Sequence, residues 1–185
     1  MKERTSIRMN RAEEGKKKRN PACRSKGAAT QLHSGMIQIR RMVPSDLPEV
    51  ERIERENFSR PWTAEDYQSF LDRADADFLV AAADGSVVGY IGEYGIPDEG
   101  DITNVSVDRR YRNRHIGSRL VSELIRTAGE RGIRKIFLEV RESNAPAIRL
   151  YENAGFRRTG IRRNYYSAPV ENAVLMMRGP EEPQM

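Results

Sequence analysis

The chain has 185 residues, 32% of them charged, and is long enough for one ordinary domain with a sizeable hydrophobic core. Residues 1–35 hold ten Lys or Arg against three Glu, a net of +7, which leaves −2 of the overall +5 for the remainder. A single cysteine excludes an internal disulfide, and with only two histidines no zinc-ligand spacing occurs, so we expect no metal. The lack of an internal disulfide predicts a cytoplasmic location. Because no apolar run approaches the ~18–20 residues that span a bilayer, we also expect no membrane partner.

The basic charge is concentrated in residues 1–35, which have almost no apolar residues at helical or strand spacing. Such a segment cannot bury enough surface to offset chain entropy, so we expect a disordered tail before one domain over residues 36–185. Several interpretations of this tail are open. It is a solvated leader or extra residues upstream of a true start at Met36, an arm that docks ribosomal RNA or another polyanion, or a cleavable signal. Cys23 lies in this tail, so we expect no thiol nucleophile in the core.

The domain begins with the pattern of one strand and two helices. Residues 36–43 alternate loosely, as a strand does, and residues 44–46 (Pro-Ser-Asp) are typical of a helix start. The core-facing stripe of this helix comprises Leu47, Val50, Ile53 and Phe58. Thr63 is suited to cap a second helix, because Glu65 and Asp66 follow it at the positive end of the helix dipole.

Three strands are expected next. Residues 78–83 and 87–96 are rich in β-forming side chains and are joined by Asp84-Gly85, a dipeptide typical of a two-residue hairpin. After a polar break at residues 97–100, the apolar positions within residues 102–108 predict another strand.

The second half alternates helices and strands. A helix over residues 117–131 has Gly132 as its stop. The remaining elements are a strand over residues 133–140, a short helix capped by Ser143 or Asn144 and closed by Gly155, and strands over residues 156–161 and 173–177. The order β-α-α-β-β-β-α-β-α-β-β predicts an α/β (α+β) fold with a locally parallel strand pair inside a mixed sheet.

The arginine-rich loop before residue 117 leads from a strand into a helix. A helix N-terminus offers unpaired backbone N–H groups and the positive end of the dipole, which together favour a phosphate. Arg112 and Arg114 add charge, and Gly117 allows a close approach of the backbone. Neither a Walker nor a Rossmann glycine pattern occurs. Taken alone, the loop is an anion site or a solvated surface turn.

The spacing of several motifs resembles the GNAT (Gcn5-related N-acetyltransferase) superfamily. Its Arg/Gln-x-x-Gly-x-Gly/Ala signature is matched from Arg112 to Gly117, except that His115 replaces the first glycine. A residue with ordinary helical φ and ψ there could still present its N–H. The other motifs are Pro61-Trp62, LEVRESN at 138–144, AIRLYENAGF at 147–156 and RRNYY at 162–166. Together they are similar to bacterial ribosomal-protein-alanine N-acetyltransferases of the RimI type, over residues 36–179.

This resemblance implies a mostly antiparallel mixed central sheet flanked by helices, with a splayed parallel strand pair that holds acetyl-CoA as cosubstrate. The implied cofactor-binding residues are Val105, Ser106 and Val107 for the pantetheine arm, Asn113, Arg114, His115, Ile116, Gly117 and Ser118 for the pyrophosphate, and Asn144. For Asn144, the alternative is a plain helix cap.

The resemblance also implies that Glu139 is the general base and Tyr151 the general acid. An α-amine with a pKa of ~8 is mostly protonated at pH 7 and must lose a proton before it attacks a thioester. Because a thioester is already activated, direct transfer needs no acyl-enzyme. The residues alone leave other interpretations open, namely a surface ion pair of Glu139 with Arg141 on an edge strand and a core position for Tyr151.

The implied acceptor is the N-terminal α-amine of a protein, with the alanine of a ribosomal small-subunit protein as the leading candidate. Tyr165 and Tyr166 resemble the family's aromatic pair that covers the acceptor, or are ordinary hairpin aromatics. The alternatives are a GNAT enzyme for lysine side chains or a small-molecule amine, and a non-catalytic acyl-CoA-binding module. An RNA-binding domain ranks last, because the part after the tail has a net charge of −2.

Overall fold

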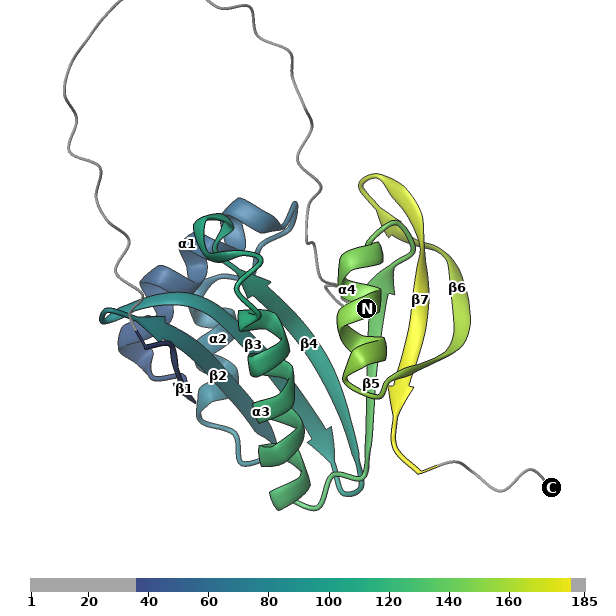
Figure 1. Cartoon of the computed structure of the whole chain (residues 1–185), viewed down its shortest axis with the longest axis horizontal. Coiled ribbons are helices and arrows are strands. Elements are labelled where there is room, and N and C mark those ends of the chain that lie inside the picture. Colours follow the sequence, from purple (N-terminus) through teal and green to yellow (C-terminus); the bar gives the residue numbers. More distant parts are fainter. Residues whose placement is uncertain (1–35, 181–185) are drawn as a thin grey trace, which may run out of the picture.

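One seven-stranded sheet, in the order β1-β2-β3-β4-β5-β7-β6, organises this computed structural model, which describes residues 36–180 (Figure 1). The predictions for residues 1–35, including the disordered tail and its polyanion contact, concern residues outside this range. Within the described range, no helix is both long and apolar enough to cross a membrane.

The order of elements agrees with the predicted order. The strands are β1 (Gln38–Arg41), β2 (Ala76–Ala83), β3 (Ser86–Ile96), β4 (Glu99–Val107), β5 (Lys135–Arg141), β6 (Arg157–Ser167) and β7 (Val170–Arg178). The helices are α1 (Leu47–Asn57), α2 (Ala64–Leu71), α3 (Ile116–Glu130) and α4 (Ala145–Asn153), with 3₁₀ turns at Pro44–Asp46 and Arg109–Tyr111.

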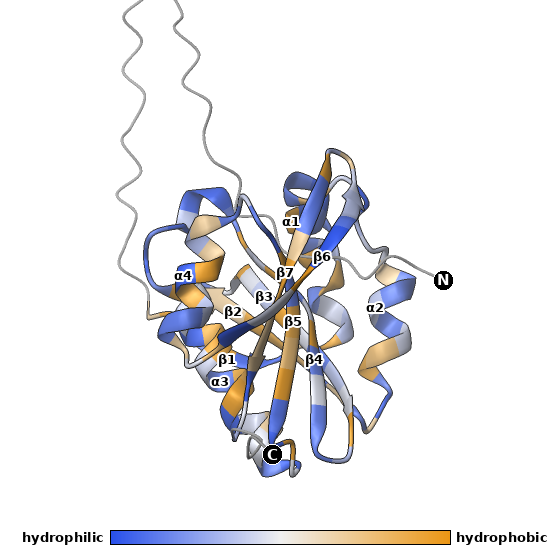
Figure 2. Ribbon diagram, turned by 90° about the vertical axis from the view of Figure 1, so that its right-hand side faces the viewer, coloured by the Kyte–Doolittle hydropathy of each residue, from blue (hydrophilic) through white to orange (hydrophobic). Residues whose placement is uncertain are grey.

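Helices cover the sheet in two layers, with α1 and α2 on one face and α3 and α4 on the other (Figure 2). The core is divided accordingly, because successive side chains of a strand point to opposite faces. Along β2, Leu79 and Ala81 join the cluster under α3, whereas Phe78 and Val80 join the cluster under α1 and α2. Each helix therefore packs its apolar face against the apolar side chains that the strands direct to that face of the sheet.

Several local signals adopt the predicted geometry. Thr63 and Asp66 form a capping box at the start of α2, in which each side chain accepts from the other's backbone N–H, at 3.2 and 3.0 Å. Asp84 and Gly85 have φ of 50° and 83°, as a two-residue hairpin requires. Gly155, at φ 87°, closes α4 in the left-handed conformation predicted for it.

Some boundaries differ from the predictions. The polar break before β4 is only a tight turn, because Asp98 takes φ 72° and its carbonyl accepts from the amides of Arg134 and Lys135. Strands β6 and β7 are both longer than predicted. The full length of β6 was not predicted because β6 is an edge strand that is exposed along most of its length and lacks apolar alternation. Strand β1 is shorter than predicted, and Phe58 follows α1 rather than lying within it.

The parallel pair of the sheet opens into a gap. Strands β4 and β5 pair only from Glu99↔Lys135 to Asp101↔Phe137, after which β5 continues its ladder with β7 alone. The rest of β4 remains in register with β3 up to Val107↔Gly89. This confirms the predicted splayed parallel pair in a mostly antiparallel sheet.

Candidate active site

Strand β4 has one backbone edge toward β3 and one toward the gap. The amide of Asp108, just after the strand, donates to the carbonyl of Val88 in β3 at 2.9 Å. Alternate residues of an antiparallel strand turn their backbone groups the same way, so Ser106 also faces β3, whereas Val105 and Val107 face the gap. These two residues are therefore the stronger candidates for pairing with a pantetheine arm.

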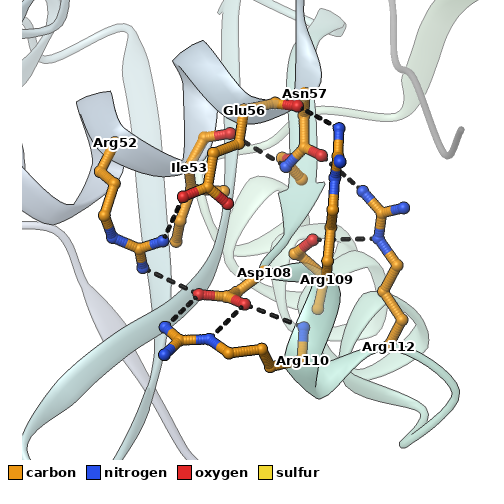
Figure 3. Close-up of polar contacts among 10 residues, drawn as sticks. Arg52, Ile53, Glu56, Asn57, Asp108, Arg109, Arg110 and Arg112 are labelled. Carbon is orange, nitrogen blue, oxygen red and sulfur yellow. Dashed lines mark hydrogen bonds and ion pairs between the residues drawn. The ribbon is translucent and has the colours of Figure 1, made fainter. Parts of the chain in front are cut away.

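Asp108 organises the loop that leads from β4 to α3. Its carboxylate accepts from the backbone and side chain of Arg110 and from the guanidinium of Arg52 in α1, with contacts of 2.8–3.1 Å (Figure 3). These bonds, those from the Arg110 side chain first, hold the pKa of Asp108 well below its usual range despite burial. The loop thus starts from a fixed ionised carboxylate.

His115 adopts a left-handed conformation at the start of α3, with φ 57° and ψ 16°. This corrects the expectation of ordinary helical angles, and it explains why a glycine suits the position, since a side chain there costs about 1–2 kcal/mol. Asn113 is also left-handed, at φ 59°. His115 makes no side-chain cap, so the first amides of α3, from Ile116 to Ser118, remain available to an anion.

The two loop arginines predicted to add charge are placed differently. Arg112 turns inward, where its Nη2 donates to Asn57 Oδ1 at 2.5 Å and its Nε donates to the carbonyl of Val107 at 3.3 Å (Figure 3). Burial, followed by the neighbouring Arg109, lowers the pKa of Arg112. Arg114 remains exposed, with its guanidinium 5.2 Å from the centre of the Tyr111 ring.

Glu139 lies on β5, opposite Leu175 of β7, on the face away from α3 and α4. Its Oε1 is 3.1 Å from Nη1 of Arg162 on β6, and the Glu139 side chain is 13% exposed. The alternative of an edge-strand ion pair with Arg141 is wrong, because β5 lies between β4 and β7 and Arg141 instead pairs with Glu171 at 3.0 Å. Glu139 is therefore a partly accessible carboxylate beside the gap.

Tyr151 is buried in α4, with its ring centre 5.5 Å from that of Phe156. It belongs to the hydrophobic cluster under α3 and α4, so the alternative of a core position for Tyr151 is observed. Burial, and then the proximity of Tyr166, raises the pKa of Tyr151 above its usual range, so the phenol keeps its proton. A protonated hydroxyl is the form that a general acid requires.

Asn144 is the N-cap of α4, and its Oδ1 accepts from the amide of Ala147 at 3.3 Å. The capping alternative is thus observed, and the contact with a cofactor stays a prediction.

The aromatic pair lies at the end of β6. The rings of Tyr165 and Tyr166 are nearly perpendicular, with centres 5.0 Å apart. Arg162 stacks over Tyr165, and the buried Arg141 lies 4.0 Å from the centre of the Tyr166 ring. Arg141 also donates to the carbonyls of Ala168 and Pro169, so it holds the tip of the β6–β7 hairpin beside the aromatic pair.

The gap and the N-terminus of α3 together fit the two ends of an acyl-CoA. The gap-facing backbone of Val105 and Val107 suits the amides of a pantetheine arm, and the amides from Ile116 to Ser118 suit a pyrophosphate. The described residues contain no group of three or more His, Cys, Asp or Glu side chains that could hold a metal ion.

Arg52 and Asn57 also shape this site, although neither belongs to a motif of the sequence, and the observed partners of Arg141 and Arg162 were not predicted. Asn57 reaches Ser106 and Arg112 across sequence separations of 49 and 55 residues. No local pattern marks such contacts, so the sequence offered no signal for them.

Comparison with known proteins supports the same chemistry. Residues 47–156 match the Acetyltransferase (GNAT) family. A putative [ribosomal protein bS18]-alanine N-acetyltransferase of Bacillus subtilis is 36% identical over 139 residues, covering 75% of this chain and 92% of the relative. The [ribosomal protein bS18]-alanine N-acetyltransferase of Escherichia coli K12 is 33% identical over 143 residues, covering 76% of this chain and 96% of the relative.

Solved structures share the fold. The ribosomal-protein-S18-alanine N-acetyltransferase from Escherichia coli superposes with a TM-score of 0.72 at 30% identity, covering 81% of this chain and 99% of that one. Ard1 from Thermoplasma volcanium gives a TM-score of 0.71 at 32% identity, with 78% and 99% covered.

The splayed strand pair, the uncapped start of α3 and these matches define an acetyl-CoA-dependent N-acetyltransferase. The chain belongs to the GNAT acetyltransferase family.

Proposed function

We propose that this enzyme acetylates the N-terminal α-amine of a protein, with the alanine of a ribosomal small-subunit protein as acceptor. The observation that carries the proposal is the similarity over about three quarters of the chain to the two bS18-alanine N-acetyltransferases. Both matches cover more than nine tenths of the relative, so the similarity extends over nearly the whole length of each relative. We also expect a cytoplasmic location, where such an acceptor is made.

In this proposal the gap-facing backbone of Val105 and Val107 aligns the thioester of acetyl-CoA with Glu139. The amides from Asn113 to Ser118 hold the pyrophosphate, and Asn144 supports the cofactor beside α4. Acetyl-CoA supplies the activated acetyl group, so the chain needs only to position the reactants and move two protons.

Glu139 is proposed as the base that takes a proton from the acceptor ammonium, directly or through a water. The freed lone pair then forms the C–N bond while the C–S bond breaks. Arg162 is the counter-ion of Glu139 in the free protein, so the acceptor ammonium exchanges with a guanidinium of equal charge. Tyr151, which keeps its proton in the free protein, donates it to the leaving sulfur. The nitrogen loses two protons in all as it becomes an amide: the first goes to Glu139, and the second replaces the proton that Tyr151 gave, so the products are the acetylated amine and the CoA thiol.

A thiol-release assay tests the acceptor. One peptide begins with a free alanine, and a matched peptide has a blocked N-terminus and an internal lysine. We expect turnover of the free N-terminus only. Turnover of the blocked peptide would assign lysine side chains as the acceptor, and turnover of neither peptide, with cofactor binding intact, would favour a small-molecule amine or a non-catalytic module.

A further inference from the structure

Three polar side chains at the end of β4, two within the strand and one just after it, point toward α1. Asn104, Ser106 and Asp108 are all buried, and each meets a polar residue of α1. The partners are Glu54 for Asn104 at 2.9 Å, Asn57 for Ser106 at 2.8 Å and Arg52 for Asp108 at 2.8 Å. Because a buried polar group is costly unless it is paired, these contacts fix the position of α1 along β4.

Asn57 is the centre of this interface and is 2% exposed. Its Nδ2 donates to the carbonyl of Ile53 at 2.9 Å and to Ser106 Oγ at 2.8 Å, and its Oδ1 accepts from Arg112 at 2.5 Å. Both amide hydrogens and the amide oxygen are therefore used, and the amide can satisfy these partners in only one orientation.

Arg112 closes the connection on the cofactor side. Its Nη2 contacts Asn57, while its Nε donates to the carbonyl of Val107, so one planar guanidinium spans the end of α1 and the end of β4 (Figure 3). A lysine ammonium has no such fork and cannot reproduce both directions. Val107 is one of the two residues whose backbone faces the gap.

We propose that Asn57 and Arg112 form a positioning latch for the acetyl-CoA site. The latch holds the gap-facing backbone of Val107 in register for the pantetheine arm, and Arg112 acts through this backbone rather than by contacting the pyrophosphate. The proposal rests on the acetyl-CoA site of the proposed function. It assigns a role to the side chain at the first position of the glycine motif, separate from the charge that the sequence suggests.

The test compares two thioesters, acetyl-CoA and S-acetyl-pantetheine, which lacks every phosphate. The full chain is used as wild type, Arg112→Met, Arg112→Lys, Asn57→Ala and the Arg112→Met/Asn57→Ala double variant. Arg119→Met serves as the control, since it removes one exposed positive charge near the start of α3 without touching the latch. Calorimetric binding of CoA and kcat/KM for both thioesters are measured.

We expect Arg112→Met to lower kcat/KM about tenfold for both thioesters alike, as the loss of one partly buried, charge-assisted contact implies. Asn57→Ala should act similarly, and the double variant should lose little more than either single variant, because the two residues act as one unit. Arg112→Lys should remain impaired, and Arg119→Met should retain wild-type values with the phosphate-free thioester.

A loss confined to acetyl-CoA would overturn the latch and make Arg112 a phosphate ligand. Additive losses in the double variant would also overturn it. If Arg112→Met fails to fold, Arg112→Lys provides the same comparison between thioesters. Wild-type protein that binds no CoA would refute the site itself, whereas wild-type binding with unaffected variants would refute only the latch.

Discussion

The acidic side chains on the two sides of the β4–β5 gap differ in their burial. On the β1–β4 side, helices cover both faces of the sheet, and the acids there are fully buried, such as Glu54, Asp77 and Glu93. On the β5–β7–β6 side, Glu139 stays partly accessible beside the half-exposed Arg162. The buried carboxylates of the covered side therefore stabilise the fold, whereas the open side keeps one carboxylate accessible for chemistry.

Burial favours the protonated form of two acids on the covered side. Burial raises the pKa of Glu54 to about 8, against which the hydrogen bonds from Trp62, Tyr67 and Asn104 act only partly. Burial also raises the pKa of Glu93 to about 7, although Arg131 pairs with its carboxylate. Glu54 is therefore a weaker candidate for the general base than Glu139, because a carboxyl with this raised pKa is mostly protonated at neutral pH.

The largest effect should come from Glu139→Gln on the open side. Loss of a general base typically costs about 10²–10⁴-fold in rate. We expect kcat with the free-alanine peptide to fall within this range while CoA affinity and the melting temperature stay unchanged. Glu152→Gln is the matched control, since Glu152 is exposed and pairs only with Arg158 in the described contacts. Equal activity of both variants would remove Glu139 from the chemistry.

The second-largest effect is expected for Tyr151→Phe. We expect kcat to fall about 10²-fold, at the lower end of the range for loss of a general acid or base. The ring and its packing on Phe156 are retained, so the melting temperature should change little. Full activity with an unchanged melting temperature would assign Tyr151 to the core alone.

Glu54→Gln should alter the pH dependence of stability on the covered side. The folded-state pKa of about 8 lies above the ordinary value of 4.5, so between these values the native protein holds a proton that the unfolded chain has released. The contribution of Glu54 is thus full below pH 4.5 and is lost as the pH rises to about 8.

Urea unfolding across this pH range measures the slope. Wild-type unfolding free energy should fall by up to about 1.4 kcal/mol per pH unit more steeply than that of Glu54→Gln, because one proton is involved. Glu93 titrates in both proteins and cancels in the comparison. Parallel curves would show that Glu54 ionises normally in the folded protein.

The smallest effect is expected for His115→Gly, at the start of α3. Glycine adopts the left-handed conformation without the side-chain penalty, so stability should rise by about 1 kcal/mol or less after the entropy of the more flexible unfolded chain is subtracted. CoA affinity should be retained, since the backbone N–H groups stay in place. A lower melting temperature would show that the imidazole makes a stabilising contact.

Local signals predicted much of the fold. Thr63 with Asp66, Asp84-Gly85 and Gly155 each specify a cap or turn within four residues, and each adopts the predicted geometry. Strand β6 escaped prediction over much of its length, because both faces of an edge strand can be polar and the period-2 pattern is then absent.

The candidate site was predictable in part. The glycine motif and the LEV strand located the loop before α3 and Glu139 in the sequence. The left-handed His115 was missed because the motif records a residue type and not its φ. The only partner that the sequence suggested for Glu139 was Arg141, as an alternative to the catalytic role, whereas the structure pairs Glu139 with Arg162. Ion pairs across strands follow the register of the sheet, which a single strand does not reveal.

The sequence by itself determined the order of elements, their caps and turns, and the family to which the chain belongs, because these depend on residues a few positions apart. Only the tertiary structure decided that β4 and β5 part after three paired residues, that Asn57 receives Arg112, and that Arg162 neutralises Glu139. Those features join segments brought together by the packing of helices on a twisted sheet, so their distances follow from the assembled fold and not from spacing along the chain.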